Sequence, residues 1–361
     1  MSSSNKIIAG KYEVLSKLSE GGMGEVFKAR HLLLDEVFVL KQVRPQLVDK
    51  EKHEQRFLRE ARTAIRLKHP NIAGIHDFFT TEGQAVLVME FIDGRTLNEI
   101  LENSGPPSLG LAFEMARQTL EALSYLHGQG FLHRDISPDN LMLTQNFDGL
   151  PWIKLLDMGL AKSLGAGGDL TSRGTFLGKA RYSAPERLSG QQDLDETSDL
   201  YSFGVTFYEL FTGHYPIRGK DFGSLISGHL LQAPRGFEET DPEGRVPESL
   251  RALLLQCLEK RPEDRFTCAR DLLNQLEEIE VEPVPASEVE GLFGVEADAG
   301  AGVPEPTVDL EVTADESGAL VLKAPVDDTE IPPTVGFEEE AEAKGLRGWM
   351  GRARRLMGSD E

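Results

Sequence analysis

The change in hydrophobic period along the chain is the feature that most restricts its fold. Residues 12–45 and 72–92 contain short stretches that are typical of β-strands, namely YEVLSKL, GEVFKAR, EVFVLKQV, IAGIHDFF and AVLVMEFI. From about residue 95 to residue 279, most apolar residues recur at helical spacing instead. Strands that come first and helices that follow tend to segregate in space, so we predict an α+β fold in two lobes.

One helical pattern, over about residues 51–68, interrupts the strands of the first lobe. The turn-forming pair Asp93–Gly94 marks the predicted hinge between the lobes. The first lobe is therefore expected at residues 12–92 and the second at residues 93–279, and residues 1–11 are expected to form an N-terminal arm.

The composition changes after Ile279, where the folded domain (residues 12–279) is predicted to end. Residues 280–343 contain 18 Asp and Glu against a single Lys, together with seven prolines. Such a composition is typical of a disordered linker. Residues 344–361 are basic, and the apolar spacing within residues 344–357 predicts a short amphipathic helix. This helix could lie on an anionic membrane, bind a partner, fold back on the acidic linker, or have no function.

Composition also excludes several classes of protein. The net charge of −22 argues against a nucleic-acid partner. Two cysteines cannot make a disulfide framework, which fits a reducing compartment. The chain has no run of 18 or more apolar residues and no apolar signal core at its start. We expect a cytoplasmic protein, with a peripheral membrane contact through the basic segment left open.

A glycine-rich stretch, LSEGGMGEV, lies between two predicted strands. Glycines let backbone amides approach phosphate groups closely, although a simple hairpin turn is the alternative. Farther along, Lys41 lies within an apolar strand, and a buried ammonium group needs a partner. Glu60 falls on the apolar stripe of the predicted helix, so we expect it to pair with Lys41. The alternative is a lysine whose ammonium group reaches solvent.

A predicted hairpin brings three polar side chains together. The loop HRDISPDN, His133–Asn140, precedes the strands LMLT and WIKLL, which the turn-rich NFDGLP joins. This hairpin folds Asp157 back toward Asn140, so Asp135, Asn140 and Asp157 are expected to converge. One carboxylate would accept a hydroxyl proton, while the other carboxylate and the amide would hold Mg²⁺, which prefers oxygen ligands.

These motifs and their order resemble those of protein kinases, and most of all the bacterial eukaryotic-type Ser/Thr protein kinases. The resemblance covers about residues 12–275. Further matching positions are His69–Ile72, Met89, Glu90, Ala184, Pro185, Glu186, Asp199 and Arg265. The resemblance implies a bilobal kinase fold and an enzyme that uses ATP with Mg²⁺, or with Mn²⁺ as an alternative.

The resemblance also implies a role for each matching position. Asp135 would be the catalytic base, with Arg134 beside it to receive an activating phosphate. Lys41, paired with Glu60, would hold the α- and β-phosphates of ATP. The implied metal ligands are Asn140 and Asp157. The implied ATP contacts are Leu18, Ser19, Gly21, Gly22, Met23, Gly24, Val26, Lys41, Met89, Glu90, Phe91, Asn140 and Asp157.

Other implied roles concern structure and specificity. Glu186 and Arg265 would form a buried salt bridge, and Asp199 would anchor the backbone of the catalytic loop. Pro138, after Ser137, resembles Ser/Thr-specific enzymes. We therefore expect protein substrates that accept phosphate on serine and threonine.

Four positions depart from the family's pattern. Ser19 replaces the first glycine of the glycine-rich loop, and Met158 replaces a phenylalanine whose packing role methionine can fill. Ser137 stands where a lysine usually contacts the γ-phosphate, and Lys179 stands where a threonine usually meets that lysine. We hypothesise that Lys179 supplies, near Asp135, the positive charge that Ser137 lacks. The alternative is that Lys179 is merely exposed on a loop.

Hydroxyl side chains in two regions are candidate phosphorylation sites. Those in the loop before Ala184 would be autophosphorylated and would order that loop, unless it is ordered without phosphate. Those in the acidic linker could recruit a phosphothreonine-binding partner, unless the linker is only a spacer. The candidates are Thr171, Ser172, Thr175, Thr329 and Thr334.

Three functions remain open at this point. The complete set of catalytic side chains favours an active protein kinase. A catalytically weak or silent ATP-binding scaffold that displays a phosphorylatable tail is the alternative, based on the departures at Ser19, Ser137 and Met158. The segment Ala184–Glu186 and Asp199 argue against a third possibility, an enzyme of the same fold that acts on a small molecule.

Overall fold

The computed structural model describes most of the chain up to Phe293 and two short stretches beyond it. The described residues are 6–21, 24–43, 62–157, 180–191, 193–219, 221–284, 286–293, 311–314 and 320–323. The chain divides into two compact units, Met1–Glu296 and Ala297–Glu361. The first unit has the two lobes that the hydrophobic period predicts.

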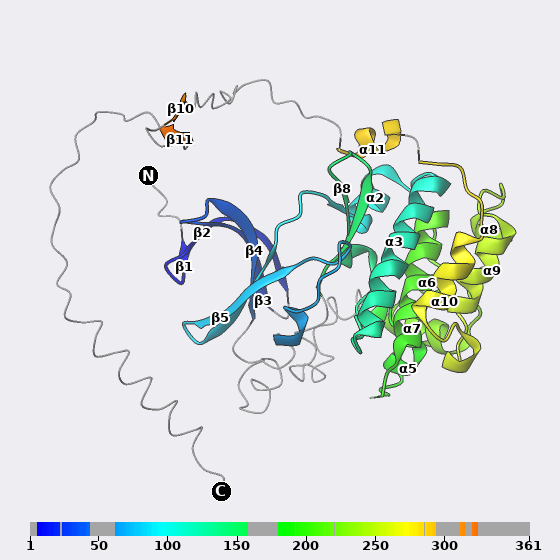
Figure 1. Cartoon of the computed structure of the whole chain (residues 1–361). Coiled ribbons are helices and arrows are strands. Elements are labelled where there is room, and N and C mark those ends of the chain that lie inside the picture. The colour runs from blue at the N-terminus through cyan, green and yellow to red at the C-terminus, as the bar shows by residue number, and fades with distance from the viewer. Residues whose placement is uncertain are drawn as a thin grey trace, which may run out of the picture. The chain divides into compact units, whose positions relative to one another are not determined.

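A six-stranded antiparallel sheet forms the N-terminal lobe (Figure 1). Its strands are β1 (Ile7–Ile8), β2 (Tyr12–Gly21), β3 (Gly24–His31), β4 (Glu36–Val43), β5 (Ile75–Thr81) and β6 (Gln84–Glu90), in the order β1-β2-β3-β4-β6-β5. Strand β1 lies in the predicted N-terminal arm, so this arm adds a strand to the sheet. The helix predicted over residues 51–68 lies outside the described residues as far as residue 61.

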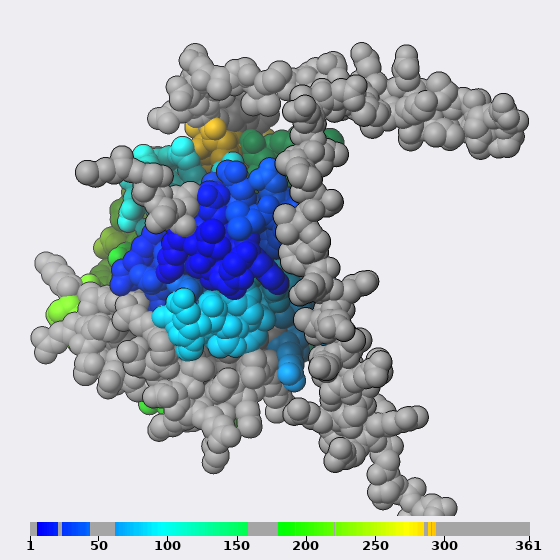
Figure 2. Space-filling model, turned by 90° about the vertical axis from the view of Figure 1, so that its left-hand side faces the viewer, coloured from blue at the N-terminus to red at the C-terminus, as the bar shows by residue number. Residues whose placement is uncertain are grey.

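The sheet buries alternate residues of β4 because successive side chains of a strand point to opposite faces. Phe38 and Leu40 are 6% and 0% exposed and pack in a small core with Tyr12 and Val88. The ring of Tyr12 stacks on Phe79 at 5.9 Å between centroids. Figure 2 shows the first strands, in blue, side by side on the face turned toward the viewer.

The C-terminal lobe is mostly helical and surrounds one long buried helix, α6. Its helices are α2 (Leu97–Ser104), α3 (Leu109–Gly128), α5 (Pro185–Leu188), α6 (Glu196–Thr212), α7 (Phe222–Leu231), α8 (Phe237–Thr240), α9 (Glu248–Cys257), α10 (Ala269–Glu277) and α11 (Ala286–Phe293). Two single turns of 3₁₀-helix are η2 (Pro138–Asn140) and η3 (Pro262–Asp264). Helix α6 is buried along almost its whole length, and the hydroxyls of its buried residues Ser202 and Thr206 donate to backbone oxygens one turn earlier in the same helix.

The hairpin predicted after the HRD loop is confirmed. Strands β8 (Leu141–Gln145) and β9 (Pro151–Leu155) pair antiparallel, and the two-residue strand β7 (Arg95–Thr96) lies on the other side of β8. Leu141 pairs with Leu155, so the residues that follow β9 return to the start of β8. This register places the two ends of the hairpin beside the boundary between the lobes.

Packed chain continues beyond Ile279, where the folded domain was predicted to end, and includes the helix α11. Helix α11 buries Val289 and Leu292 against the core, at 2% and 9% exposure. Glu288 accepts hydrogen bonds from the backbone N–H of Ser108, at 2.7 Å, and from its hydroxyl, at 2.5 Å. In Figure 1, α11 lies beside α2 at the top of the lobe. The sequence did not predict this helix, because acidic residues and prolines surround its few apolar residues.

The second unit contains a short antiparallel hairpin, β10 (Glu311–Ala314) with β11 (Leu320–Lys323), inside the predicted linker. The rest of the linker from residue 294 and the basic segment 344–361 lie outside the described residues. Within the part that the structure describes, no helix is both long enough and apolar enough to cross a membrane.

Candidate active site

One buried carboxylate holds the backbone of the catalytic loop. Asp199, near the start of α6, accepts a hydrogen bond from the N–H of His133 on one oxygen and from the N–H of Arg134 on the other, each at 2.7 Å. The side chain of Asp199 is 2% exposed. The role predicted for Asp199, that of an anchor for this loop, is confirmed.

Helix α3 supplies a further partner for Asp199. The Nε2 atom of His127 lies 3.0 Å from the carboxylate of Asp199, and its Nδ1 atom lies 3.5 Å from that of Glu196. Burial alone would raise the pKa of Asp199, but the hydrogen bond and charge of His127 and the backbone N–H of Arg134 hold this pKa below its ordinary value. Asp199 therefore stays charged and keeps both loop amides in place. No sequence pattern indicated His127, which lies among apolar residues of a helix.

His133 ties the loop to the end of the hairpin. Its Nε2 atom lies 2.7 Å from the carbonyl oxygen of Leu156, and its Nδ1 atom accepts the N–H of Asp135 at 3.3 Å. A carbonyl oxygen only accepts, so the neutral ring carries its proton on Nε2. The imidazole thus sets the distance between the catalytic loop and the chain just before Asp157.

Hydrogen bonds join the segments that carry Asp135, Asn140 and Asp157, the three residues predicted to converge. The amide Nδ2 of Asn140 donates to the backbone oxygen of Asp135 at 2.7 Å. The backbone N–H of Leu156, which precedes Asp157, donates to the backbone oxygen of Asn140 at 2.8 Å. Since Nδ2 is held on the loop, the orientation of the Asn140 side-chain oxygen is fixed as well.

The ammonium of Lys41 pairs with Asp157 rather than standing alone in its strand. Nζ lies 2.6 Å from Oδ2 of Asp157, and the two side chains are 14% and 38% exposed. This pair joins β4 of the N-terminal lobe to the residues that follow β9. Glu60, the predicted partner of Lys41, lies outside the described residues.

Two residues of the site have left-handed backbones, which cost non-glycine residues roughly 1–2 kcal/mol each. Arg134 has φ 63° and Asp157 has φ 50°. Arg134 is held there from both sides, because its N–H binds Asp199 and its carbonyl accepts a hydrogen bond from the guanidinium of Arg187. The sequence reading missed Arg187, which is the residue directly after Glu186. Such strain is typical of functional sites, where surrounding contacts maintain it.

Predicted ATP contacts lie in one row across the sheet. Ser19 pairs with Val26 across β2 and β3, and Val26 pairs with Lys41 across β3 and β4. Cross-strand neighbours share a face, so Val26 and Lys41 lie on the same side of the sheet. Gly24 has φ +150°, and a Cβ there would lie 1.8 Å from the carbonyl oxygen of Gln42. The turn therefore requires glycine at this position.

The remaining predicted ATP contacts are only partly placed. Leu18 is 49% exposed on β2, Gly21 pairs with Gly24, and Gly22 and Met23 lie outside the described residues. Met89 is 9% exposed and pairs with Val39 of β4.

Glu90, at the end of β6, is a predicted ATP contact whose side chain binds other parts of the protein. The carboxylate of Glu90 accepts the N–H of Gly74 at 2.9 Å and pairs with Lys154 at 2.7 Å. Its own N–H donates to the carbonyl oxygen of Gly74 at 2.8 Å. Phe91, next in sequence, has the ammonium of Lys28 at 4.0 Å from its ring centroid. The Glu90 side chain thus links the end of β6 to Gly74 and to Lys154 of β9.

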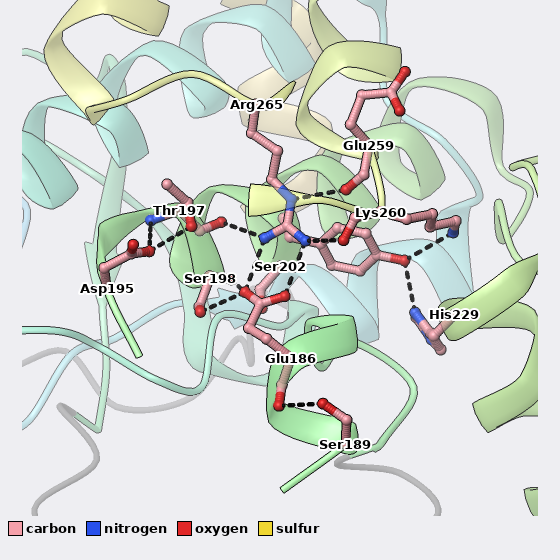
Figure 3. Close-up of polar contacts among 11 residues, drawn as sticks. Glu186, Ser189, Asp195, Thr197, Ser198, Ser202, His229, Glu259, Lys260 and Arg265 are labelled. Carbon is pink, nitrogen blue, oxygen red and sulfur yellow. Dashed lines mark hydrogen bonds and ion pairs between the residues drawn. The ribbon is translucent and has the colours of Figure 1, made fainter. Parts of the chain in front are cut away.

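The predicted salt bridge between Glu186 and Arg265 is confirmed (Figure 3). Two parallel hydrogen bonds of 2.9 Å join the guanidinium to the carboxylate, and Ser198 donates a third to Glu186 at 2.6 Å. Arg265 also donates to the backbone oxygens of Thr197, Glu259 and Lys260. The pair therefore fixes the start of α5 against α6 and the segment before η3.

Acidic side chains surround the other end of the catalytic loop. Burial, followed by the negative charges of Glu102, Asp135 and Glu99, raises the pKa of Asp139 above its ordinary value. Asp139 lies in η2, and both glutamates lie on α2. The electrostatic potential beside Asp135 is therefore negative on the α2 side.

Several predicted site residues fall outside the described part of the chain, and their placement stays a prediction. They are Gly22, Met23, Glu60, Met158, Thr171, Ser172, Thr175, Lys179, Thr329 and Thr334.

A family model for the protein kinase domain matches residues 12–276. The chain belongs to the protein kinase family. The family and the bilobal fold predicted from the motifs are thus confirmed. Kinases of this family use ATP and a divalent metal ion.

Bacterial Ser/Thr kinases are among the relatives. This kinase is 38% identical over 281 residues to the serine/threonine-protein kinase pkn3 of Myxococcus xanthus, covering 77% of this chain and 51% of that protein. It is 35% identical over 263 residues to the serine/threonine-protein kinase PknD of Mycobacterium tuberculosis, covering 73% and 39%. The matched part is about half of the first relative and less of the second.

Solved kinase structures share the fold. The kinase domain of Mycobacterium tuberculosis PknI matches with a TM-score of 0.58 and 28% identity, covering 77% of this chain and 99% of that one. Rad53 residues 1–466, solved in complex with AMP-PNP, matches with a TM-score of 0.61 and 25% identity, covering 73% and 64%.

Proposed function

We propose that this kinase transfers the γ-phosphate of ATP to serine and threonine hydroxyls of proteins, including its own. The observations that support the proposal are the hydrogen bonds that link the segments of Asp135, Asn140 and Asp157, and the ion pair of Lys41 with Asp157 at 2.6 Å. The identity to bacterial kinases named as Ser/Thr enzymes supports the choice of acceptor.

Asp135 is the proposed base. The acceptor hydroxyl would donate a hydrogen bond to its carboxylate, which orients the oxygen toward the γ-phosphate and takes the proton as transfer proceeds. The loop that carries Asp135 is fixed at both ends, by Asp199 at His133 and Arg134 and by the side chain of Asn140. This rigidity holds the carboxylate where the hydroxyl must lie.

The oxygen atoms of Asn140 and Asp157 fit a magnesium ion, with manganese as an alternative. Mg²⁺ is usually held by one or two protein oxygen ligands together with phosphate oxygens. In keeping with this, the described residues contain no cluster of three or more His, Cys, Asp or Glu able to hold a metal by themselves. When bound, the ion neutralises charge on the β- and γ-phosphates. Lys41 orients Asp157 through Oδ2, and the other carboxylate oxygen, Oδ1, is the proposed ligand of the ion.

Lys179 is the proposed source of the charge that Ser137 cannot supply. Ser137 directly precedes η2, and its backbone oxygen accepts the N–H of Asn140 at 3.0 Å. A lysine directly before Ala180 is close in sequence to residues that contact the catalytic loop, since Arg187 binds Arg134. This supports a Lys179 ammonium near Asp135 and the transferred phosphate.

Regulation by the chain's own hydroxyls is part of the proposal. Candidate autophosphorylation sites are Thr171, Ser172, Thr175, Thr329 and Thr334. Phosphates on Thr171, Ser172 or Thr175 would bind Arg134. Phosphates on Thr329 or Thr334 would recruit a phosphothreonine-binding protein. The basic segment 344–357 would add a contact with an anionic membrane or a partner protein.

The test is incubation of the full chain with Mg²⁺-ATP, followed by mapping of phosphosites by mass spectrometry. Wild-type protein should gain phosphothreonine or phosphoserine, and Asp157→Asn should gain none. Asp135→Asn should lose at least the roughly 10²–10⁴-fold typical of a general base. Asp148→Asn is the matched control, because Asp148 is an exposed aspartate in the turn between β8 and β9.

Two further results would decide between the proposals. If Lys179→Ala leaves kcat unchanged, Lys179 does not replace the missing lysine. The pair Ser137→Lys with Lys179→Thr should restore more activity than either single change. If the wild-type chain transfers no phosphate to itself or to casein, a silent scaffold replaces the kinase as the better description.

A further inference from the structure

A buried histidine outside the catalytic loop contacts the backbone next to the active site. His229, on α7, is fully buried. Its Nε2 atom lies 3.0 Å from the carbonyl oxygen of Arg181, and its Nδ1 atom lies 2.9 Å from the hydroxyl of Tyr201 on α6. The carbonyl only accepts, so Nε2 donates its proton, and Nδ1 accepts the proton of Tyr201. Every polar atom of the imidazole is therefore used by one neutral tautomer.

A second donor reaches the same carbonyl. The hydroxyl of Tyr215 donates to Arg181 and lies 2.8 Å from Nε2 of His229. On the far side, the ammonium of Lys260 lies 3.4 Å from the hydroxyl of Tyr201. In Figure 3, His229 and Lys260 are joined by dashed lines to that one hydroxyl. Two donors on a single carbonyl make a strong fixed point in the backbone.

The side chains beside this carbonyl are held by α6. The guanidinium of Arg181 pairs with Glu209 at 2.9 Å and lies 4.3 Å from the ring centroid of Tyr215. The hydroxyl of Tyr182 donates to the other oxygen of Glu209 at 2.6 Å. Residues 181 and 182 are thus fixed by both side chains and by the backbone.

These residues begin a strip that runs alongside the catalytic loop. We define the anchored strip as residues 180–187. Its last residue, Arg187, donates to the carbonyl of Arg134, which directly precedes Asp135. The strip therefore ends at a residue that is hydrogen-bonded to the backbone just before Asp135.

We propose that His229 is a positioning residue for the protein acceptor, because it fixes the anchored strip through the Arg181 carbonyl. This inference rests on the proposed function and adds a residue that touches neither ATP nor the reacting atoms. The acceptor is a polypeptide segment that lies against the strip while its hydroxyl meets Asp135. Loss of the Nε2 donor lets the strip shift and weakens acceptor binding, while ATP binding on the sheet face is untouched.

The test compares His229→Leu with His229→Gln in the full chain, with myelin basic protein as the acceptor. Leucine removes both hydrogen bonds, whereas the glutamine amide keeps an N–H at about the reach of Nε2. His229→Leu should raise KM for the acceptor about five- to tenfold, the effect of one or two lost hydrogen bonds. It should change KM for ATP less than about twofold, and His229→Gln should recover most of the acceptor KM. His214→Leu is the control, because His214 is an exposed histidine one residue before Tyr215.

Other outcomes overturn the inference. They are an unchanged acceptor KM in His229→Leu, an equal rise in both KM values, or no recovery in a folded His229→Gln. Where His229→Leu does not fold, Tyr215→Phe removes only the second donor to Arg181 and should still raise the acceptor KM about two- to fivefold. An unchanged KM in that variant also overturns the inference. A wild-type chain that phosphorylates nothing overturns the proposed function as well, whereas normal wild-type transfer with unaffected variants overturns this inference alone.

Discussion

At the scale of single residues, Glu186 and Arg265 show how a charge is kept in a nearly dry environment. Their side chains are 5% and 0% exposed. Burial would raise the pKa of Glu186, but hydrogen bonds from Arg265 and Ser198 hold this pKa below its ordinary value. The Glu186 carboxylate therefore stays charged, and the stability of the folded protein depends on Arg265 pairing with it.

Replacing Arg265 with methionine should cost about 3–5 kcal/mol of unfolding free energy, because it leaves a buried charge unpaired. Urea denaturation measures the loss. Arg261→Met is the control: Arg261 is 73% exposed and pairs with Glu263 at the surface, so its loss should stay below about 1 kcal/mol. Adding Glu186→Gln to Arg265→Met should recover part of the stability. Equal losses for the two arginine variants would contradict the argument.

The buried imidazole of His229 predicts a pH dependence of stability. Burial, followed by the charge of Lys260, lowers the pKa of His229 to about 4. The other groups facing it are Tyr201 from α6, Tyr215 from the loop before α7 and the carbonyl of Arg181. None of them supplies a negative charge that would favour the imidazolium.

Between pH 6.5 and 4 the unfolded chain binds a proton at His229 that the folded chain does not, so stability falls as the pH falls. The whole difference corresponds to roughly 3 kcal/mol. At pH values above about 6.5 this contribution is fully present. Urea unfolding of wild type and of His229→Gln at several pH values should show a steeper acid loss in wild type. Parallel curves would show that His229 does not cause the loss.

At the scale of elements, the sequence predicted best where local pattern decides the structure. The hairpin β8–β9 follows from two short strands around a turn-rich segment, and it places Leu156 beside Asn140 as expected. The contacts of His127 and Arg187 were not predictable, because each depends on residues far away in the chain. Helix α11 was hidden in the same way, since Glu288 and Ser108 lie 180 residues apart.

The position of the segment that leads into α11 depends on Gly110. A Cβ on Gly110, near the start of α3, would lie 2.5 Å from the carbonyl oxygen of Glu282. Gly110→Ala should therefore displace the segment that leads into α11, although alanine favours an isolated helix by about 1 kcal/mol. Hydrogen exchange of residues 280–293 should rise in this variant. Gly128→Ala, in the same helix with nothing within 4 Å of the added Cβ, should leave exchange unchanged. If both variants behave alike, the close contact does not hold the segment.

At the scale of the whole molecule, the site exists only where distant parts of the chain meet. Lys41 comes from the N-terminal lobe, Asp157 from the end of the hairpin, and Asp199 from the buried helix α6. We call the first compact unit, Met1–Glu296, the kinase unit. Residues from both ends of its sequence are needed to form the site. Helix α11 belongs to that unit, although its composition resembles that of the acidic residues after it.

Two truncations test where the kinase unit ends. A chain ending at residue 293 keeps α11 and should match the full chain in urea stability. A chain ending at residue 279 loses the buried side chains of Val289 and Leu292, each worth about 1.5–3 kcal/mol, so it should lose about 3 kcal/mol or more. Leu292→Ala in the full chain should reproduce much of that loss, because it leaves a cavity under α11. If the two truncated chains are equally stable, α11 contributes nothing and the unit ends at the boundary that composition alone suggests.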